Sequence, residues 1–285
     1  MYRIGILGTE NSHADAFADI VNNPGSPYAG EFKVTALYAL DERPSQLIQA
    51  KHADDDIRIV GSPEEMLPLV DCVMVTARHG KYHKEFALPF IREGMPAFID
   101  KPFTVSTETA IQLVDEANAH GAPICGGSGC KYSPEILKLK EDIAAGAIGK
   151  VTSAMITFAV DLDSVYGGLY FYSSHLIEEM ITLFGDDIRT VHAFRSGKKL
   201  LAVARYPELD VTMNFEHTYT AVVYGEKGWL HIPTGCDKIY EAEFAHFADM
   251  VRTGSTDTTA EDLIKPVRIM DAISKSLVSG RDEAV

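Results

Sequence analysis

Apolar and polar positions alternate through the first 120 residues in a repeating order: a short apolar run, a turn, then a stretch with helical period. This order predicts βαβ units, in which parallel strands are covered by helices on both faces. The expected strands are Tyr2 to Leu7, Lys33 to Leu40, Asp71 to Ala77 and Pro96 to Ile99. The expected helices begin at Ser12 or His13, after Ser62, near Tyr82 and at Thr107.

The pattern changes after about residue 122, where strand-period runs follow one another and the last four are separated only by turns. Such spacing indicates a mostly antiparallel sheet. The expected strands lie within 151–160, 189–195, 199–206, 210–217 and 220–225. Two helix-period stretches, 172–184 and 260–278, accompany them. We therefore expect a second, α+β domain over residues 123–285, whose sheet is a plausible dimer surface.

Charge and composition exclude several classes of function. The 41 acidic and 26 basic side chains make a net charge of -15, which opposes binding to nucleic acid or to an anionic membrane. No segment approaches the roughly 20 apolar residues of a membrane span, and the first residues lack the features of a signal peptide. The four cysteines form no CxxC pair. We expect a cytoplasmic protein with free thiols.

The turn after the first strand is a candidate phosphate site, because a doubly wound fold presents backbone N–H groups and a helix N-terminus there. Set on the pattern G-x-G-x-x-G, only Gly8 matches, and Glu10 and His13 occupy the other two glycine positions. Either the Glu10 carboxylate repels a diphosphate, or the loop follows another path with polar donors. The donors available are Thr9, Asn11 and Ser12. A tight capped turn without a ligand is the third interpretation.

Asp41 follows the second expected strand, at the position where a carboxylate accepts hydrogen bonds from the ribose 2′-hydroxyl of NAD. Arg43 stands close by and leaves room for the 2′-phosphate of NADP. The pair therefore favours NAD slightly. A solvated acid that opens a helix is the alternative interpretation.

Asp100, Lys101 and Pro102 follow a buried strand at the edge where open α/β sheets bind their ligands. A lysine in this place can hydrogen-bond a substrate hydroxyl and assist its proton transfer. This segment is the most informative one in the chain for function.

Asp100-Lys101-Pro102 resembles the E-K-P motif of the Gfo/Idh/MocA oxidoreductases, a family that includes inositol dehydrogenase and glucose-fructose oxidoreductase. Residues 70–83 resemble the family's preceding strand and loop, with Arg78 in place of the usual proline. The resemblance implies a Rossmann-like parallel-sheet domain at residues 1–122. It also implies that NAD or NADP contacts Gly8, Thr9, Asn11, Ser12, Asp41, Thr76, Ala77, His83, Asp100, Lys101 and Pro102.

The same family carries a glycine-rich turn followed by Asp, three residues and His on a helix. Here Gly167-Gly168 precede His175, and Phe171 stands where the Asp is expected. The resemblance implies that His175 takes part in proton transfer with Lys101, a role suited to an imidazole. Tyr172 lies three residues before His175 and can supply a hydrogen bond. Lys131 and Tyr132 occupy the Arg-aromatic position that lines the substrate side of the family.

A metal site is not expected. His13, His79 and His83 with Glu10 are the only cluster that suggests one, and they supply no i, i+4 ligand pair on one helix.

The leading hypothesis is an NAD(P)-dependent oxidoreductase that transfers hydride to or from a sugar, polyol or related hydroxyl compound. Two alternatives stay open. One is an NAD-assisted lyase or glycosidase on the same fold, and the other is a non-catalytic member that senses a metabolite or binds a partner. We expect a homodimer or homotetramer formed through the C-terminal sheet.

Overall fold

The computed structural model describes residues 1–236 and 239–285. The chain divides into two compact units, each built from two separate segments. The first unit contains Met1–Gly127 and Tyr240–Leu263, and the second contains Ser128–Ile239 and Ile264–Val285. Among the described residues, no helix combines the length and the apolar character that crossing a membrane requires.

The first unit is built on a parallel sheet whose strands lie in the order β3-β2-β1-β4-β5-β6. The strands are β1 (Tyr2–Leu7), β2 (Phe32–Tyr38), β3 (Arg58–Ile59), β4 (Cys72–Val75), β5 (Ala97–Asp100) and β6 (Ile124–Gly127). The order reverses between β1 and β4, which lie side by side. In open α/β sheets the ligand crevice lies outside the carboxyl ends of the strands at such a switch point.

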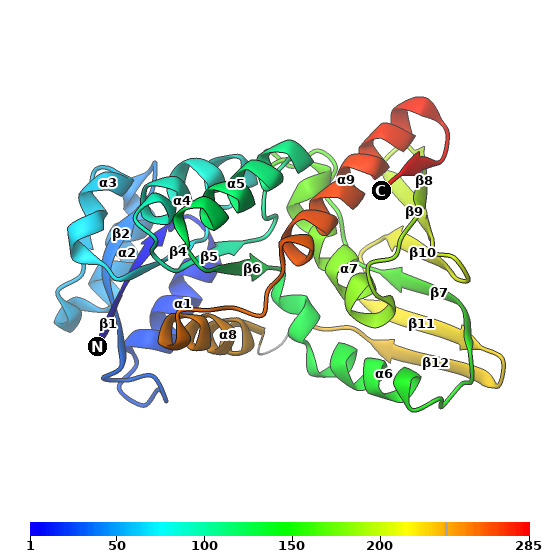
Figure 1. Ribbon diagram of the computed structural model, residues 1–285, viewed down its shortest axis with the longest axis horizontal. Helices are drawn as coiled ribbons and strands as arrows, with labels where there is room; N and C mark the ends of the chain where they lie inside the picture. The colour runs from blue at the N-terminus through cyan, green and yellow to red at the C-terminus, as the bar shows by residue number, and fades with distance from the viewer. Residues whose placement is uncertain (237–238) are drawn as a thin grey trace. The chain divides into compact units, whose positions relative to one another are not determined.

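Helices pack on both faces of this sheet (Figure 1). They are α1 (Ser12–Asn22), α2 (Glu42–Lys51), α3 (Pro63–Met66), α4 (His83–Arg92), α5 (Thr107–His120) and α8 (Ile239–Thr253). Ser62 caps α3 by accepting a hydrogen bond from the Glu65 N–H, and Gly121 ends α5 in the left-handed conformation. Local sequence therefore sets these helix ends, as cap chemistry requires.

Helix α8 lies beside α1 on one face of the sheet, although more than one hundred residues separate them in sequence (Figure 1). Phe244 of α8 contacts Phe32 of β2, and Phe247 contacts Phe98 of β5, with ring centroids 5.6 and 6.3 Å apart. Phe244 and Phe247 are completely buried. Burial of each such side chain stabilises the fold by about 1.5 to 3 kcal/mol, so α8 is part of the core of the first unit.

The second unit is built on a mixed sheet in the order β12-β11-β7-β10-β9-β8-β13. The strands are β7 (Val151–Thr157), β8 (Thr190–Ser196), β9 (Lys199–Arg205), β10 (Asp210–Phe215), β11 (Thr220–Gly225), β12 (Gly228–Pro233) and β13 (Glu283–Ala284). Only β7 and β10 pair in parallel among these strands; the other neighbours are antiparallel. The expected mostly antiparallel sheet is confirmed.

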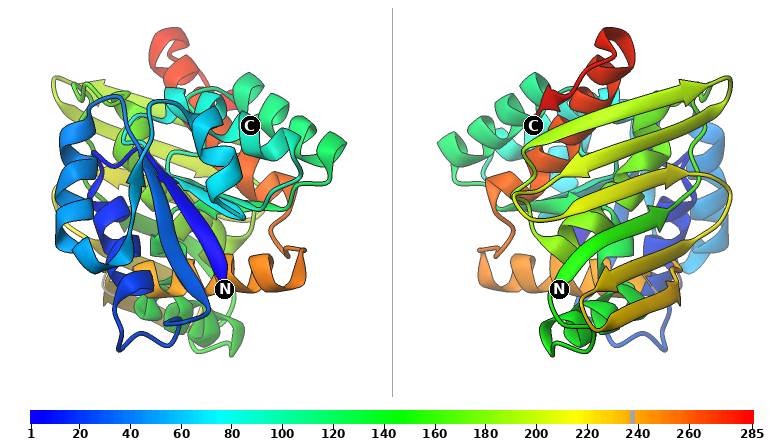
Figure 2. Two further views of the ribbon diagram at one scale, coloured as in Figure 1. Left: turned by 90° about the vertical axis from the view of Figure 1, so that its left-hand side faces the viewer. Right: turned by 90° about the vertical axis from the view of Figure 1, so that its right-hand side faces the viewer.

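Three helices of the second unit are α6 (Pro134–Ala144), α7 (Leu169–Phe184) and α9 (Ala260–Ser279). Figure 2 (right) shows the sheet with its strands toward the viewer and these helices behind it. On the face without helices, Phe194 of β8 pairs with Leu201 of β9, and Tyr224 of β11 pairs with Trp229 of β12. All four side chains are exposed to solvent.

The fold class predicted from the sequence is confirmed, but the observed units differ from the expected boundary at residue 122. Strand β6 pairs with β5 and extends the first sheet to Gly127. The segment 240–263 also returns to the first unit. Hydrophobic periodicity marks α8 as amphipathic but does not indicate which sheet its apolar face covers. The packing of α8 on the first sheet is therefore decided by tertiary contacts.

Candidate active site

Gly8 brings the turn after β1 against the end of β4. The backbone φ of Gly8 is +93°, which residues with a side chain rarely adopt. A Cβ atom at position 8 would lie 2.2 Å from the Cα and N atoms of Ala77. The Gly8 N–H donates to the Tyr38 carbonyl at 2.8 Å. Only glycine fits at this position. Its close approach to Ala77 places the turn after β1 at the switch point between β1 and β4.

The side chains of Thr9 and Asn11 are engaged inside the protein rather than presented to a ligand. Thr9 Oγ1 lies 2.7 Å from Ser45 Oγ. Asn11 Oδ1 caps α1 by accepting from the His13 N–H, and its Nδ2 donates to Asp100 Oδ2. Ser12, the first residue of α1, is exposed. The donors left at this helix N-terminus are thus the Ser12 hydroxyl and backbone N–H groups, where the helix dipole favours an anion.

Glu10 is held by the loop that follows β4. Its Oε1 accepts a hydrogen bond from the Arg78 N–H at 3.0 Å. This contact agrees with a loop that follows another path than the G-x-G-x-x-G pattern, with the Glu10 carboxylate tied to a backbone N–H. The carboxylate links two neighbouring turns at the sheet edge.

Asp100 is completely buried at the end of β5 and holds two elements together. Its Oδ2 lies 2.7 Å from His13 Nδ1, and its Oδ1 accepts from the Lys101 N–H at 2.6 Å. Burial opposes ionisation, yet the His13 imidazole and the charge of Lys101 bring the pKa of the Asp100 carboxyl below its ordinary value. Lys101 is itself 3% exposed, and the peptide bond to Pro102 is cis.

Thr76, Ala77 and His83 brace the same edge. Thr76 Oγ1 donates to the carbonyl oxygens of Leu7 and Gly8. His83 is fully buried, with Nε2 2.7 Å from the Ala77 carbonyl oxygen and Nδ1 3.2 Å from the Phe103 carbonyl oxygen. Burial lowers the pKa of His83. The side chains of Thr76 and His83 therefore hold the loops after β1, β4 and β5 in place.

Asp41 caps α2 and pairs with its neighbour Arg43. The Asp41 carboxylate accepts from the Arg43 N–H at 3.1 Å and from the Arg43 guanidinium at 2.5 Å, and this hydrogen-bonded guanidinium lowers the pKa of Asp41. A pocket of about 330 Å³ lies between the β1 turn and α2. Its lining includes Thr9, Ser12, Pro44, Leu47 and Lys51. The pocket combines an apolar wall with polar groups, as nucleoside sites do.

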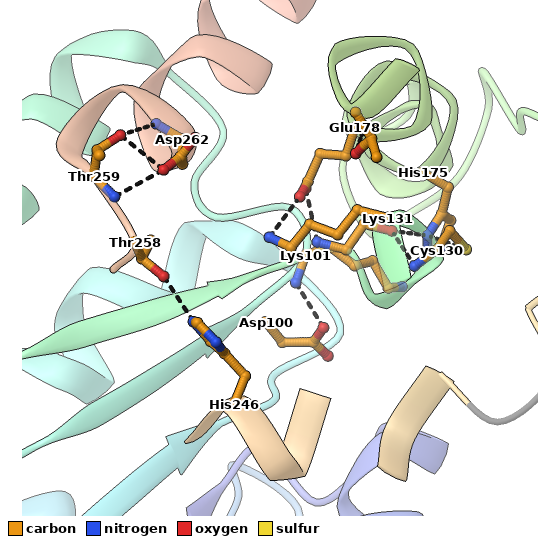
Figure 3. Close-up of polar contacts among 12 residues, drawn as sticks. Asp100, Lys101, Cys130, Lys131, His175, Glu178, His246, Thr258, Thr259 and Asp262 are labelled. Carbon is orange, nitrogen blue, oxygen red and sulfur yellow. Dashed lines mark hydrogen bonds and ion pairs between the residues drawn. The ribbon is translucent and has the colours of Figure 1, made fainter. Parts of the chain in front are cut away.

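His175 lies on α7 in the second unit, against the turn η4 (Gly129–Tyr132). Its Nδ1 is 2.7 Å from Ser128 Oγ. The same nitrogen is 3.4 Å from the Sγ atom of Cys130, which Figure 3 labels beside His175. The three side chains are at most 6% exposed. A hydrogen bond with the Cys236 thiol, together with burial, raises the pKa of Cys130, which is therefore a protonated thiol beside the imidazole.

Lys131 is paired with Glu178 on the same helix. Lys131 Nζ lies 3.0 Å from Glu178 Oε2 (Figure 3). Glu178 Oε1 accepts from the Ser128 N–H at 2.7 Å. The Lys131 ammonium also lies 5.3 Å from the ring centroid of Tyr132. These contacts fasten the turn η4 to α7.

Aromatic rings surround His175. Phe158 packs on the imidazole with 5.0 Å between ring centroids, and Tyr172 lies at 5.8 Å. Phe171 is buried against Tyr166 and Tyr172. The residue that replaces the family's Asp is therefore part of an apolar packing cluster.

Three residues of the site were not singled out by the sequence analysis for these roles: His13, Ser128 and Glu178. Two of them carried a positional signal. Ser128 directly follows β6 at the carboxyl edge of the parallel sheet, and Glu178 lies three residues after His175, on the same helical face. His13 was noticed only as a departure from the glycine pattern.

Residues 2–127 match the model of a family described as "Oxidoreductase family, NAD-binding Rossmann fold", the Gfo/Idh/MocA family. The first unit thus matches the Gfo/Idh/MocA oxidoreductases over residues 2–127, which are less than half of the chain. The match contains the β1 turn, the Asp100-Lys101-Pro102 motif and all six strands of the first sheet.

Two curated relatives of this chain are named as dehydrogenases. The D-xylose 1-dehydrogenase (NADP(+)) of Hypocrea jecorina is 27% identical over 60% of this chain and 45% of its own length. The inositol 2-dehydrogenase of Agrobacterium fabrum is 30% identical over 42% of this chain and 34% of its own length. The chain thus spans about half or less of these two relatives.

Solved structures share the whole fold at low sequence identity. The myo-inositol 2-dehydrogenase of Lactobacillus plantarum superposes with a TM-score of 0.87 and 16% identity, covering 100% of this chain and 99% of that one. The myo-inositol dehydrogenase of Lactobacillus casei, solved with NAD(H) and myo-inositol, has a TM-score of 0.85 and 18% identity, covering 100% and 97%. These likenesses establish the architecture of both units.

Proposed function

We propose that this protein is an NAD(P)-dependent oxidoreductase that transfers hydride to or from a sugar, polyol or related hydroxyl compound. The observation that carries the proposal is the Asp100-Lys101-Pro102 motif at the carboxyl end of β5, in a unit that matches an NAD-binding family model. The names of the xylose and inositol dehydrogenases support the same class of substrate.

The residues at the edge of the first sheet fit a dinucleotide. The Ser12 hydroxyl and the N-terminus of α1 suit a pyrophosphate, and the Glu10 carboxylate is tied to the Arg78 N–H. The pocket between the β1 turn and α2 suits the adenosine half. When bound, the nicotinamide supplies the hydride chemistry, and the chain supplies position and proton transfer.

Asp41 and Arg43 bear on the choice between NAD and NADP. The carboxylate is an acceptor for a ribose 2′-hydroxyl, and the guanidinium is a partner for a 2′-phosphate. Because Arg43 is already paired with Asp41, we propose NAD as the preferred cofactor.

Lys101 and His175 are proposed to serve the proton transfer at the substrate hydroxyl, with Tyr172 in support. Lys131 and Tyr132 are proposed to line the substrate side, where the Lys131–Glu178 pair holds the turn η4 rigid. A rigid turn places its side chains without an entropic cost during binding.

We further propose a homodimer or homotetramer that forms through the exposed face of the second sheet. The apolar pairs Phe194–Leu201 and Tyr224–Trp229 give this face the character of an interface. Analytical ultracentrifugation of wild type and Trp229→Glu tests this, and an unchanged oligomer in the variant contradicts it.

Calorimetric titration with NAD and NADP, followed by turnover assays on a panel of polyols and aldoses, tests the proposed function. Binding of NAD together with net reduction of the cofactor by a hydroxyl compound supports it. Substrate consumption without net reduction favours a lyase or glycosidase, and failure to bind either dinucleotide rejects the oxidoreductase.

A further inference from the structure

Ser128 makes two hydrogen bonds to one face of α7. Its N–H donates to Glu178 Oε1 at 2.7 Å, and its hydroxyl lies 2.7 Å from His175 Nδ1. Residues 175 and 178 are three apart and share a helical face. Ser128 is completely buried, so its contacts with the helix are shielded from water. The hydrogen bond from the Ser128 N–H to Glu178 therefore holds the serine hydroxyl beside the His175 imidazole.

The direction of the Ser128–His175 hydrogen bond follows from the other contact of the hydroxyl. Ser128 Oγ accepts from the Cys130 N–H at 3.2 Å. If the imidazole carried its proton on Nδ1 and donated it, the Ser128 O–H would have to donate to the Cys130 sulfur, with which it also forms a side-chain hydrogen bond, and a thiol sulfur is a weaker acceptor than an imidazole nitrogen. If the hydroxyl donates to Nδ1, both the serine and the imidazole nitrogen are satisfied.

Chemistry around Nδ1 agrees with this direction. The Ser128 hydroxyl and the protonated Cys130 thiol both lie within 3.4 Å of Nδ1, and each can donate a hydrogen bond. The position from which the family pattern would supply a carboxylate is occupied by Phe171, which is buried against Tyr166 and Tyr172. A carboxylate at Nδ1 would require a proton there, whereas a hydroxyl allows Nδ1 to accept.

We propose that Ser128 fixes the tautomer of His175 by donating its hydroxyl proton to Nδ1, which keeps the ring proton of the neutral imidazole on Nε2. Ser128 is then a positioning residue. The inference rests on the proposed function in one respect: with a proton on Nε2, neutral His175 donates a hydrogen bond to the substrate oxygen, and proton removal from the hydroxyl falls to Lys101. Neutral histidines serve as such donors elsewhere.

The tautomer is testable by ¹⁵N NMR of the ligand-free protein, with the His175 signals assigned as those absent from His175→Gln. In wild type at a pH where the ring is neutral, we expect an unprotonated Nδ1 and a protonated Nε2. Ser128→Ala should shift the Nδ1 signal, whereas Ser128→Thr, which keeps the hydroxyl, and Cys130→Ala, which removes only the thiol, should leave it near the wild-type position. A protonated Nδ1 in wild type overturns the proposal. So does an Nδ1 signal that Ser128→Ala leaves in place.

A second measurement connects the tautomer to turnover. Ser128→Ala should lower kcat at least about tenfold with little change in KM, and Ser128→Thr should restore it, because an imidazole in the wrong tautomer cannot present its proton. His175→Gln, which keeps an N–H donor, should retain more activity than His175→Ala. If Ser128→Ala moves the Nδ1 signal and kcat is unchanged, the hydrogen bond is as inferred and the proposed role of His175 in the reaction is rejected.

Discussion

His13 Nδ1 of α1 lies 2.7 Å from Asp100 Oδ2 at the end of β5, and both side chains are buried. The contact joins a residue that stands at a glycine position of the phosphate-loop pattern to the acid of the Asp-Lys-Pro motif. The imidazole thus helps to compensate a carboxylate that is completely removed from water. His13, which departs from the glycine pattern, is thus the partner of the buried Asp100 carboxylate.

Removal of this partner should destabilise the first unit. His13→Ala leaves the buried Asp100 carboxylate without its imidazole, and breaking a buried pair in this way costs about 3 to 5 kcal/mol. Asp100→Asn in the His13→Ala background should recover much of the loss, because the amide carries no charge. Urea unfolding of the single and double variants measures both effects. Additive losses in the double variant would mean that the two side chains act independently.

Glu10→Gly should weaken NAD binding rather than strengthen it. The substitution removes the hydrogen bond from the Arg78 N–H and frees the turn after β1, at a cost of about 1 kcal/mol or roughly fivefold in Kd. Glu10→Gln is the matched control, since it keeps an acceptor oxygen and removes the charge. Calorimetric titration gives the sign, and tighter binding by both variants would show that charge repulsion dominates.

Lys101→Ala and His175→Ala should each lower turnover by about 100-fold or more while dinucleotide affinity stays near wild type. If the two side chains serve one proton-transfer step, the double variant should lose little more than the worse single variant. Steady-state kinetics on the substrate found in the panel assay measures this. Wild-type turnover in both single variants removes these residues from the mechanism.

Glu179→Gln should stabilise the protein at neutral and alkaline pH. Burial raises the pKa of Glu179 to about 9, and neither carboxyl oxygen has a hydrogen-bond partner among the described residues. The folded state then keeps a proton that the unfolded chain releases near pH 4.5, so wild-type stability falls as the pH rises from 4.5 to 9.

Glu179→Gln has no carboxyl to titrate, so its free energy of unfolding should not fall over this pH range. The difference between the variant and wild type should grow to about 1 to 3 kcal/mol by pH 8 and vanish below pH 4.5. Thermal unfolding across this pH range measures it. Glu141→Gln, at an exposed position on α6, is the control and should leave the slope unchanged. An equal slope in wild type and Glu179→Gln would show that the carboxyl is ionised in the folded state.

Local signals in the sequence were sufficient for most of the fold. Strand β1 has the predicted bounds and helix α5 begins at the predicted Thr107, because an apolar run and an N-cap are local features. Helix α8 and strand β6 lie within residues 123–285, where the sequence analysis expected the second domain, but they belong to the first unit. Their placement depends on which distant surface their apolar side chains cover, and periodicity does not record that.

The site was predicted unevenly for the same reason. The motif lysine, Lys101, stands at the edge of the sheet as the strand pattern required. The side chains of Thr9 and Asn11 were expected to face a phosphate and instead bond Ser45 and Asp100. Polar residues in a loop can satisfy themselves inside the protein, and only the tertiary partners decide between the two outcomes.

The return of α8 to the first unit has a consequence for the newly made chain. All six strands of the first sheet have left the ribosome once Gly127 has emerged, but Phe244 and Phe247 are synthesised only after most of the second unit. During that interval Phe32 and Phe98 lack the rings that bury them in the finished protein. Translation thus passes through a stage with an uncovered apolar sheet face, a surface that chaperones bind and that aggregates when they are scarce.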